Sequence, residues 1–174
     1  MNATTTKPAT SITTEALCTE SLRKVRIVKI SSCQNLSESG EITYHIGVSD
    51  QGEILFRIHA NSSSGYFSRE WIPLVGIQGV FAEVAADEFI TSYTLHTLFK
   101  GKSTNSPGFM LAALLAAGLV QRSTTNDRGY ESTDGKEFFT SIQALIESGD
   151  SLDPDAKLKK ASKKKASLDA PPLA

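Results

Sequence analysis

Residues 41–60 contain two runs, EITYHIGV and EILFRIHA, in which every second residue is apolar. A period of two places the apolar side chains of a strand on one face. The apolar faces of the two strands coincide if Ile46 lies opposite Phe56 and Tyr44 lies opposite Ile58. This register predicts an antiparallel hairpin.

The predicted register leaves a loop of three residues, Asp50, Gln51 and Gly52, between the two strands. A three-residue loop that ends in glycine fits a type I turn followed by a left-handed glycine bulge. A two-residue loop would instead pair Ile46 with Leu55 and put the apolar rows on opposite faces. Register and turn chemistry therefore favour the same hairpin.

A third strand is predicted before the hairpin, in residues 23–30 (RKVRIVKI), because this run is rich in β-branched residues. The polar stretch at residues 31–40 (SSCQNLSESG) follows it and is expected to form a loop. The predicted sheet is therefore a three-stranded antiparallel meander over residues 22–61.

Helical spacing replaces alternation from residue 68 onward. The apolar residues that recur at intervals of three or four are Leu74, Ile77, Phe81 and Val84. Ser68 can cap this helix, and Pro73 is tolerated in a first turn. A second helix is predicted from Asp87 to about Phe99, because acidic residues begin the segment and lysines follow its end.

Ser106 and Pro107 begin a third predicted helix, and Gly118 lies where a left-handed C-terminal cap would end it. The runs LVQR and YES can then form the strands of a short hairpin, with STTNDRG as its turn. Thr133 or Asp134 is expected to start a final helix. Its apolar residues share one stripe: Phe138, Phe139, Ile142, Leu145 and Ile146.

This order of elements, in which a helix, the exit AAGLVQR, a hairpin and RGYESTDGKEFF follow one another, resembles the winged helix-turn-helix superfamily. The resemblance covers residues 87–147 and is to the superfamily, not to one family within it. It implies that the helix before the wing enters the major groove of DNA and that nearby polar or basic residues contact phosphates and base edges. Those residues would be Ser103, Thr104, Asn105, Ser106, Arg122 and Arg128. Lys100 and Lys102 could add non-specific contacts with phosphates, which need only positive charge.

The predicted recognition helix departs from the DNA-binding pattern. From Pro107 to Ala117 it has no charged or amide side chain, so no arginine can bind guanine and no asparagine or glutamine can bind adenine. A helix that is apolar on all sides is usually buried. It could pack between the sheet and the final helix, or it could form a dimer or partner surface through Met110 and Leu114.

Composition separates two tails from a folded part of this chain of 174 residues. Residues 1–21 contain seven Thr and few large apolar residues, so they cannot bury enough surface to offset the entropy of ordering. We expect disordered segments at 1–21 and 149–174 around a single α+β domain at 22–148. Residues 22–150 carry 11 Lys or Arg against 14 Asp or Glu, which makes the folded part mildly acidic.

Positive charge is concentrated in the C-terminal tail, where the lysines that could contact phosphates are Lys159, Lys160, Lys163, Lys164 and Lys165. Neutralising phosphates requires only positive charge, so this tail could bind DNA or RNA without reading sequence. The tail could also bind an acidic protein surface, or it could serve only to keep the chain in solution.

The sequence carries no recognisable catalytic or metal-binding pattern. The hairpin register sets His45 opposite Arg57 and His59 opposite Thr43, on the less apolar face of the sheet, where we expect a solvated surface without a nucleophile or a paired acid. There is no HExxH, no phosphate-loop pattern and no CxxC. We therefore predict a protein that is not an enzyme, with free thiols and with neither cofactor nor metal.

Three aromatic residues, Tyr66, Phe67 and Trp71, lie in or next to the Ser-rich link before the first predicted helix. Exposed aromatic residues often anchor a protein partner or stack on bases. Alternatively, Trp71 could fold back onto the hydrophobic core. Tyr66, Phe67 and Trp71, together with Met110 and Leu114, form the predicted partner-binding set.

The sequence thus predicts an α+β fold, with a three-stranded antiparallel sheet followed by helices that end in a winged-helix-like unit. The expected function is that of a non-enzymatic, DNA-associated regulatory or accessory protein, dimeric and binding through its wing and basic tail. The alternative is a protein-interaction adaptor or dimerisation module that uses the same unit. No apolar run is long enough for a membrane span and no secretion signal is recognisable, so we expect a cytoplasmic protein.

Overall fold

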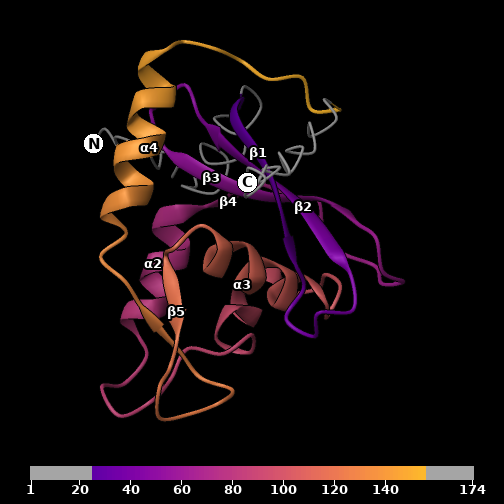
Figure 1. Cartoon of the computed structure of the whole chain (residues 1–174), viewed down its shortest axis with the longest axis vertical. Coiled ribbons are helices and arrows are strands. Elements are labelled where there is room, and N and C mark those ends of the chain that lie inside the picture. The colour runs from indigo at the N-terminus through magenta and orange to yellow at the C-terminus, as the bar shows by residue number, and fades with distance from the viewer. Residues whose placement is uncertain (1–24, 156–174) are drawn as a thin grey trace, which may run out of the picture.

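A four-stranded antiparallel sheet forms the first half of the fold in the computed structural model, which describes residues 25–155 (Figure 1). Its strands follow the chain order β1-β2-β3-β4. They are β1 (Arg26–Gln34), β2 (Glu41–Val48), β3 (Ile54–Asn61) and the short β4 (Ile72–Pro73). The α+β class is confirmed, and the sheet has one strand more than the sequence predicted.

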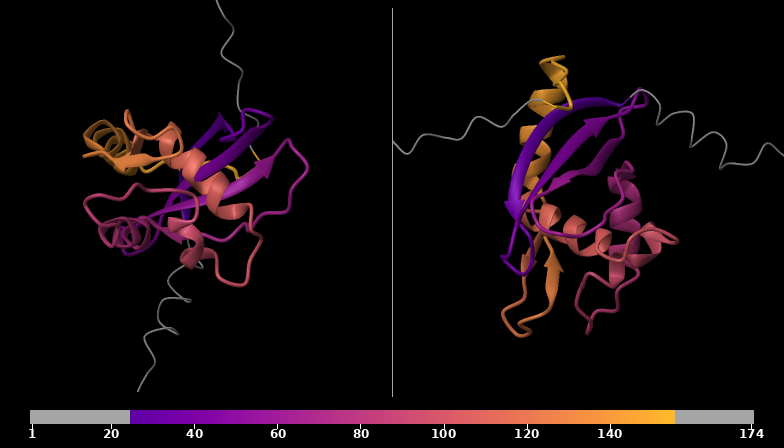
Figure 2. Two further views of the ribbon diagram at one scale, coloured as in Figure 1. Left: turned by 90° about the horizontal axis from the view of Figure 1, so that it is seen from below. Right: turned by 90° about the vertical axis from the view of Figure 1, so that its right-hand side faces the viewer.

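The second half of the fold contains helices and a small hairpin. Its elements are α2 (Leu74–Ala82), the 3-10 helix η2 (Thr94–Phe99), α3 (Ser106–Ala116), β5 (Val120–Arg122), β6 (Tyr130–Ser132) and α4 (Lys136–Glu147). Helix α3 packs across β1, β2 and β3, while α4 packs against β1 (Figure 2). The β5–β6 hairpin projects from the end of the molecule opposite the sheet.

The β2–β3 hairpin has the predicted register. Ile46 pairs with Phe56 and Tyr44 pairs with Ile58. The turn is closed by a hydrogen bond from the Ser49 amide to the Glu53 carbonyl, at 2.9 Å. Gly52 has a φ of 80°, in the left-handed region where glycine is unstrained. The predicted glycine bulge is therefore confirmed.

The register changes at the far end of the hairpin. A shift between Thr43 and Tyr44 pairs Thr43 with Ala60. The prediction that His59 lies opposite Thr43 is therefore wrong, although His45 does pair with Arg57. An extra residue of this kind is a β-bulge, which strand patterns do not reveal because it interrupts the period of two.

The first strand is longer than its sequence pattern indicated. The polar residues 31–34, predicted to be a loop, continue β1 and pair with residues 41–44 of β2. Antiparallel pairing satisfies backbone groups whatever the side chains are, so a partner strand can override weak local propensity. The fourth strand has a similar origin, because Ile72 and Pro73 pair with Phe56 and Leu55 at the sheet edge.

The predicted helix from Asp87 to Phe99 is wrong for its first half. The Ile90 amide and carbonyl both hydrogen-bond to the backbone of Tyr130, each at 2.9 Å, and this β-bridge requires extended backbone. Helical geometry begins only at Thr94, as the 3-10 helix η2. A contact with the distant hairpin therefore decides the structure of this segment.

Two predicted helix starts are displaced, and one predicted cap residue has another role. Ser68 does not cap α2, which begins at Leu74 after Pro73 as its N-cap residue. Helix α4 begins at Lys136, after Gly135, and not at Thr133 or Asp134. Ser106 is the first residue of α3 and its hydroxyl accepts a hydrogen bond from the Ser68 amide at 2.8 Å, so it joins two segments and does not cap its own helix.

The end of α3 and the hairpin that follows match the prediction. Gly118 has a φ of 76°, and its amide donates to the Leu115 carbonyl at 3.1 Å, as expected of a left-handed C-terminal cap. In the β5–β6 pair, Val120 lies opposite Ser132 and Arg122 opposite Tyr130.

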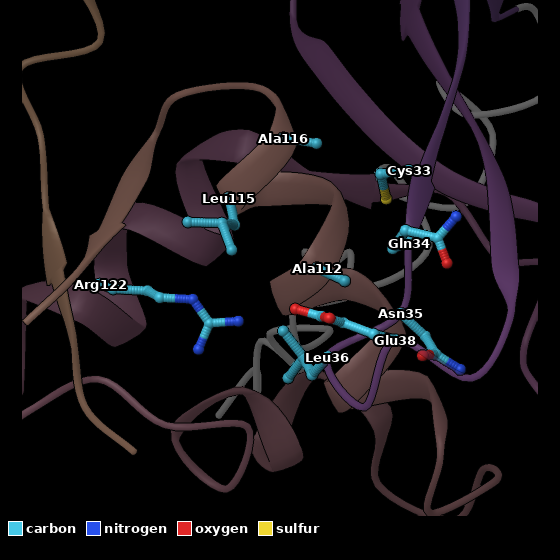
Figure 3. Close-up of a pocket in the computed structure, with 9 residues that line it drawn as sticks. All are labelled: Cys33, Gln34, Asn35, Leu36, Glu38, Ala112, Leu115, Ala116 and Arg122. Carbon is cyan, nitrogen blue, oxygen red and sulfur yellow. The ribbon is translucent and has the colours of Figure 1, made fainter. Parts of the chain in front are cut away.

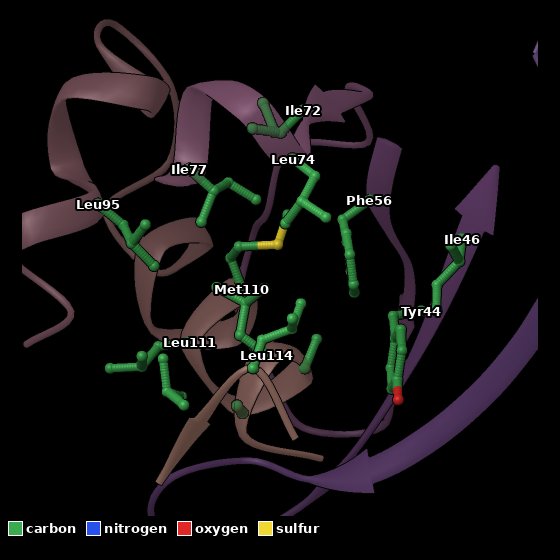
Figure 4. Close-up of a cluster of buried hydrophobic side chains, with 14 of the residues drawn as sticks. Tyr44, Ile46, Phe56, Ile72, Leu74, Ile77, Leu95, Met110, Leu111 and Leu114 are labelled. Carbon is green, nitrogen blue, oxygen red and sulfur yellow. The ribbon is translucent and has the colours of Figure 1, made fainter. Parts of the chain in front are cut away.

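The core lies between the sheet and the helices (Figure 4). Side chains from the strands, among them Tyr44, Ile46 and Phe56, meet those of the helical half, among them Ile77, Leu95, Met110, Leu111 and Leu114. Helix α3 contacts the sheet on one side and η2 on another, which explains why its sequence is apolar on both of these sides. Helix α3 is therefore buried against the sheet, as one of the two predictions had it. Its second neighbour is η2 and not the final helix. Within residues 25–155, no helix is long and apolar enough to cross a membrane.

Candidate interaction groove beside helix α3

Two cavities lie next to each other along the free side of α3, with volumes of about 210 and about 240 Å³. Both are lined by Asn35 and Leu36. We call the pair the α3 groove. The α3 wall consists of Gly108, Phe109, Ala112, Leu115 and Ala116, and the opposite wall consists of residues 33–38 (Figure 3). Arg122 lies at one end, and Ser92, Thr104 and Asn105 lie at the other.

The α3 wall is shallow because small residues recur every fourth position. Gly108, Ala112 and Ala116 occupy positions i, i+4 and i+8, which lie on one side of a helix. Half-buried Phe109 and Leu115 flank this row. The groove thus has an apolar floor without a hydrogen-bond donor or acceptor on any α3 side chain between Gly108 and Ala116.

The opposite wall is fixed by the side chain of Asn35, which is buried. Its Oδ1 accepts hydrogen bonds from the Ser39 amide at 3.0 Å and the Ser37 hydroxyl at 3.1 Å, and its Nδ2 donates to the Ser39 hydroxyl at 3.2 Å. The Asn35 amide donates to the Gly40 carbonyl at 2.8 Å. These bonds form a closed turn of the type that Asn favours, and they hold Leu36 against the groove.

Glu38 lies at the tip of this turn with a φ of 56°. Among residues 25–155 it is the one non-glycine residue in the left-handed region, a conformation that costs about 1 kcal/mol for a side chain of this kind. Its amide donates to the Asn35 carbonyl at 2.9 Å. The turn therefore fixes the Glu38 backbone, and the Glu38 side chain lines the edge of the cavity (Figure 3).

Arg122 reaches the same cavity from β5 (Figure 3). Its guanidinium lies 5.6 Å from the centre of the Tyr130 ring, in a cation–π arrangement. Within the described part of the chain no carboxylate lies within 4.0 Å of it. A basic and an acidic group thus border one apolar cavity, and neither is neutralised by the other.

The structure gives the predicted nucleic-acid residues at the start of α3 an internal role. The Ser103 hydroxyl and the Asn105 amide group both donate to the Tyr66 carbonyl. Lys102 forms an ion pair with Glu70 at 2.7 Å. Ser103, Lys102 and Asn105 therefore fasten the segment around residues 66–70 to the helix, and part of their hydrogen-bonding capacity is used within the chain.

The other predicted nucleic-acid residues are dispersed. Thr104 lines the groove, while Lys100 and Arg128 are exposed. Arg128 lies in the β5–β6 loop and lines neither cavity of the groove. The five tail lysines, Lys159, Lys160, Lys163, Lys164 and Lys165, lie outside the described residues.

The predicted partner-binding residues have four different environments. Tyr66 is 92% exposed. Phe67 is half-buried with its ring against that of Phe109, next to the groove. Met110 and Leu114 are both 0% exposed, so they belong to the core and cannot contact a partner in this structure. Trp71 is not part of the core cluster. Its ring instead lies against the Arg57 guanidinium, whose central carbon is 4.5 Å from the centre of the Trp71 ring.

Sequence reasoning missed the groove wall at Asn35, Leu36 and Glu38. These residues fall in a stretch predicted to be a loop, and the one local signal is an asparagine followed by serines two and four positions later. Such spacing is typical of side chains that bond to their own turn. The single leucine in this polar run was the other available signal.

Three observations describe the chemistry of the groove. Burial, followed by the charge of Glu41, raises the pKa of the Cys33 thiol to about 11, so this residue of the groove is protonated at neutral pH and is a poor nucleophile. No group of three metal-binding side chains occurs among residues 25–155. Each cavity is smaller than the roughly 300–1,000 Å³ typical of small-ligand sites, which suits a single inserted side chain.

Comparisons with protein-family models, with curated proteins and with solved structures find no match.

Proposed function

We propose that this chain is a non-enzymatic protein-interaction adaptor that captures a short peptide segment of its partner in the α3 groove. The observation that carries the proposal is the row Gly108, Ala112 and Ala116, which leaves two adjoining cavities open along α3. A helix that only filled the core would need no such row on its free side.

The groove favours a peptide with a small apolar side chain. The cavity next to Arg122 has a volume of about 210 Å³ and an apolar floor, so an aliphatic side chain can enter it. Because Arg122 and Glu38 border the cavity, we expect an acidic residue on one side of the inserted residue and a basic residue on the other. Hot spots of this kind need one buried anchor and a polar rim.

A substitution that fills the groove tests this function. Ala116 is exposed at the last position of α3 and lines the cavity, so Ala116→Trp should block it without disturbing the core. Ala82→Trp is the matched control, because Ala82 is an exposed alanine at the last position of α2. Peptides selected from a random display library would be measured by fluorescence anisotropy.

We expect Ala116→Trp to weaken peptide binding by at least about tenfold, the effect of losing one buried anchor, and Ala82→Trp to bind as the parent protein does. Arg122→Glu should lower the affinity for peptides that carry an acidic residue. If no peptide is enriched, or if both tryptophan variants bind equally well, the adaptor proposal is wrong.

A second candidate function is a DNA-associated regulatory protein, and the chain order of the helical half favours it. Helix α2, the bridge at Ile90, η2, α3 and the β5–β6 hairpin follow one another, which supports the winged-helix resemblance. In this case binding would rest on phosphate contacts from Arg122, Arg128 and the lysine tail.

The two functions differ in their dependence on Arg128, which lies in the wing and not in the groove. DNA binding predicts that Arg128→Ala weakens the affinity for mixed duplex DNA and that this affinity falls steeply between low and moderate salt. The adaptor predicts that Arg128→Ala leaves peptide affinity unchanged. Anisotropy with labelled duplex and with labelled peptide separates them.

A further inference from the structure

The sheet face opposite the core carries a cluster of cationic and aromatic side chains. Alternation along β2 and β3 turns His45 and Arg57 away from the core that holds Tyr44 and Phe56. The group, which we call the outer-face cluster, consists of His45, Arg57, His59, Arg69 and Trp71. The sequence pattern suggested a solvated face here, and this expectation is wrong because His45 is 0% exposed.

The Arg57 guanidinium is held in place from two sides. Its Nη2 lies 2.9 Å from Nδ1 of His45, and its central carbon lies 4.5 Å from the centre of the Trp71 ring. The His45 ring in turn stacks on that of His59, with 4.2 Å between centres and 19° between planes. Stacked and bonded in this way, the guanidinium is preorganised to present its remaining N–H groups.

The bond between Arg57 and His45 determines the tautomer of the imidazole. A guanidinium only donates, so Nδ1 of His45 must accept and its proton must be on Nε2. That Nε2–H is buried and has no acceptor among the described residues. The Arg57 Nε–H is likewise buried without an acceptor. Two buried, unsatisfied donors in one cluster are unusual in native proteins and point to an absent acceptor.

The cluster is also short of negative charge. Within residues 25–155, no carboxylate lies within 4.0 Å of Arg57. The nearest acidic group that acts on the cluster is Asp155, whose carboxylate lies 3.6 Å from Nε2 of His59 and whose side chain is 87% exposed. Burial, followed by the charge of Arg69, lowers the pKa of Arg57, while Asp155 raises it. One exposed carboxylate therefore faces two guanidinium groups.

We propose that the outer-face cluster binds an oxyanion, a carboxylate of an acidic peptide or a phosphate, and that Asp155 occupies part of this site from within the chain. Arg57 and His59 would contact the oxyanion directly, as planar guanidinium groups favour, and Arg69 would add its charge. The remaining Nη N–H groups of Arg57 supply the hydrogen bonds, and the two buried donors add positive partial charge behind them. This site is separate from the α3 groove and does not depend on the function proposed for the groove.

The experiment uses the full chain and its single tryptophan, Trp71, as the reporter. Inorganic phosphate and a tetra-aspartate peptide are titrated separately at constant ionic strength, and the fluorescence of Trp71 is recorded. We expect a saturable change with at least one of them. A peptide response alone identifies peptide carboxylates as the ligand, and a phosphate response alone identifies a free oxyanion. If both bind, they should compete.

Substitutions in the outer-face cluster test whether the fluorescence response arises from ligand bound there. Arg69 is exposed, so Arg69→Gln should fold normally and weaken binding by roughly fivefold to tenfold. Asp155→Asn removes the internal competitor and should tighten binding several-fold. The controls are Arg128→Gln, which removes an exposed arginine of the wing, and Asp127→Asn, which changes an exposed acid of the same loop. Both should bind as the parent chain does.

A second measurement is the chemical shift of the imidazole nitrogens of His45 and His59 in nuclear magnetic resonance. It reports on the site independently of Trp71 fluorescence. Their shifts should move with the ligand in the parent chain and less in Arg57→Lys, since lysine keeps the charge and loses the planar fork. The proposal fails if neither ligand gives a saturable response, if sodium chloride alone reproduces it, or if Arg69→Gln and Arg57→Lys bind as tightly as the parent chain.

Discussion

His45 shows at the scale of one residue how burial controls a titration. Burial, followed by the charges of His59 and Arg57, lowers its pKa from 6.5 to about 4. The charged groups around it are Arg57, His59, Arg69 and, through His59, Asp155. Of these, His59 and Arg57 disfavour a proton on His45. The folded protein therefore keeps this imidazole neutral at pH values where the unfolded chain protonates it.

The consequence is a loss of stability in acid. Between about pH 6.5 and about pH 4 the unfolded chain binds a proton that the folded chain does not, so the free energy of unfolding falls as the pH falls through this window. His45 alone accounts for up to about 3 kcal/mol of that fall. His59, whose pKa is lowered by burial, then by Arg57 and Arg69 and despite Asp155, adds in the same direction.

Urea unfolding at about pH 7.5 and about pH 4.5 tests this prediction, because the difference between the two free energies contains the His45 contribution. In His45→Gln the difference should shrink by a few kcal/mol. His96→Gln is the control, since His96 is exposed on η2. An equal acid loss in the parent chain and in His45→Gln would show that His45 is not the group responsible.

At the scale of elements, sequence determined structure where the constraint was local. The β2–β3 hairpin was predictable because its alternation, its three-residue loop and Gly52 all favour one register. The cap at Gly118 was predictable for the same reason. Segment 87–93 was not, because its conformation depends on the bridge between Ile90 and Tyr130. A helical propensity of a few tenths of a kcal/mol per residue is easily overridden by such a contact.

The candidate groove was predictable only in part. Thr104, Asn105 and Arg122 were chosen for contacts with DNA, and all three line the groove. The opposite wall was missed because it comes from the end of β1 and the turn after it, and only the tertiary fold brings these to α3. A pattern along one element shows which side chains share a face. It does not show which distant turn lies against that face.

Burial also had to come from the structure. Met110 and Leu114 share the apolar character of Phe109 and Leu115, and no sequence pattern separates the two pairs because α3 is apolar on every side. In the fold, the first two are completely buried and the last two border the groove. In an amphipathic helix, the apolar stripe in the sequence identifies the buried face. A helix such as α3 has no such stripe.

At the scale of the whole molecule, Arg26 joins the first strand to the end of the last helix. Its Nη1 donates to the Asp150 carbonyl at 2.7 Å, and its Nη2 donates to the Ile146 carbonyl at 3.1 Å. The Leu152 amide then donates to the Ile27 carbonyl at 2.9 Å. The Ile146 carbonyl also accepts from the Gly149 amide at 3.2 Å, and because carbonyls at a helix C-terminus carry negative partial charge, a guanidinium at the end of α4 is favourable.

These contacts between β1 and the end of α4 predict that removing the Arg26 side chain lowers the free energy of unfolding. Arg26→Ala deletes two charge-assisted hydrogen bonds between segments far apart in the chain and should lower the free energy of unfolding by about 1 to 2 kcal/mol. Arg26→Lys should recover part of the loss, because lysine keeps the charge near the helix end. Lys29→Ala, in the same strand, is the control. Urea unfolding of the three variants at neutral pH would measure these differences, and equal losses in Arg26→Ala and Lys29→Ala would contradict the role given to Arg26.

The same contacts between β1 and residues 150–152 determine where the chain can be shortened without loss of stability. A chain that ends at Gly149 loses the Asp150 carbonyl and the Leu152 amide, so it should be destabilised even if the lysine tail has no structural role. A chain that ends at Asp155 keeps both contacts with β1. If shortened chains are used to test whether the lysine tail binds DNA, chains with these two ends should therefore be compared. A loss that appears already at Asp155 comes from the tail, whereas a loss that appears only at Gly149 comes from an opened junction between β1 and α4, and it should be accompanied by a lower free energy of unfolding.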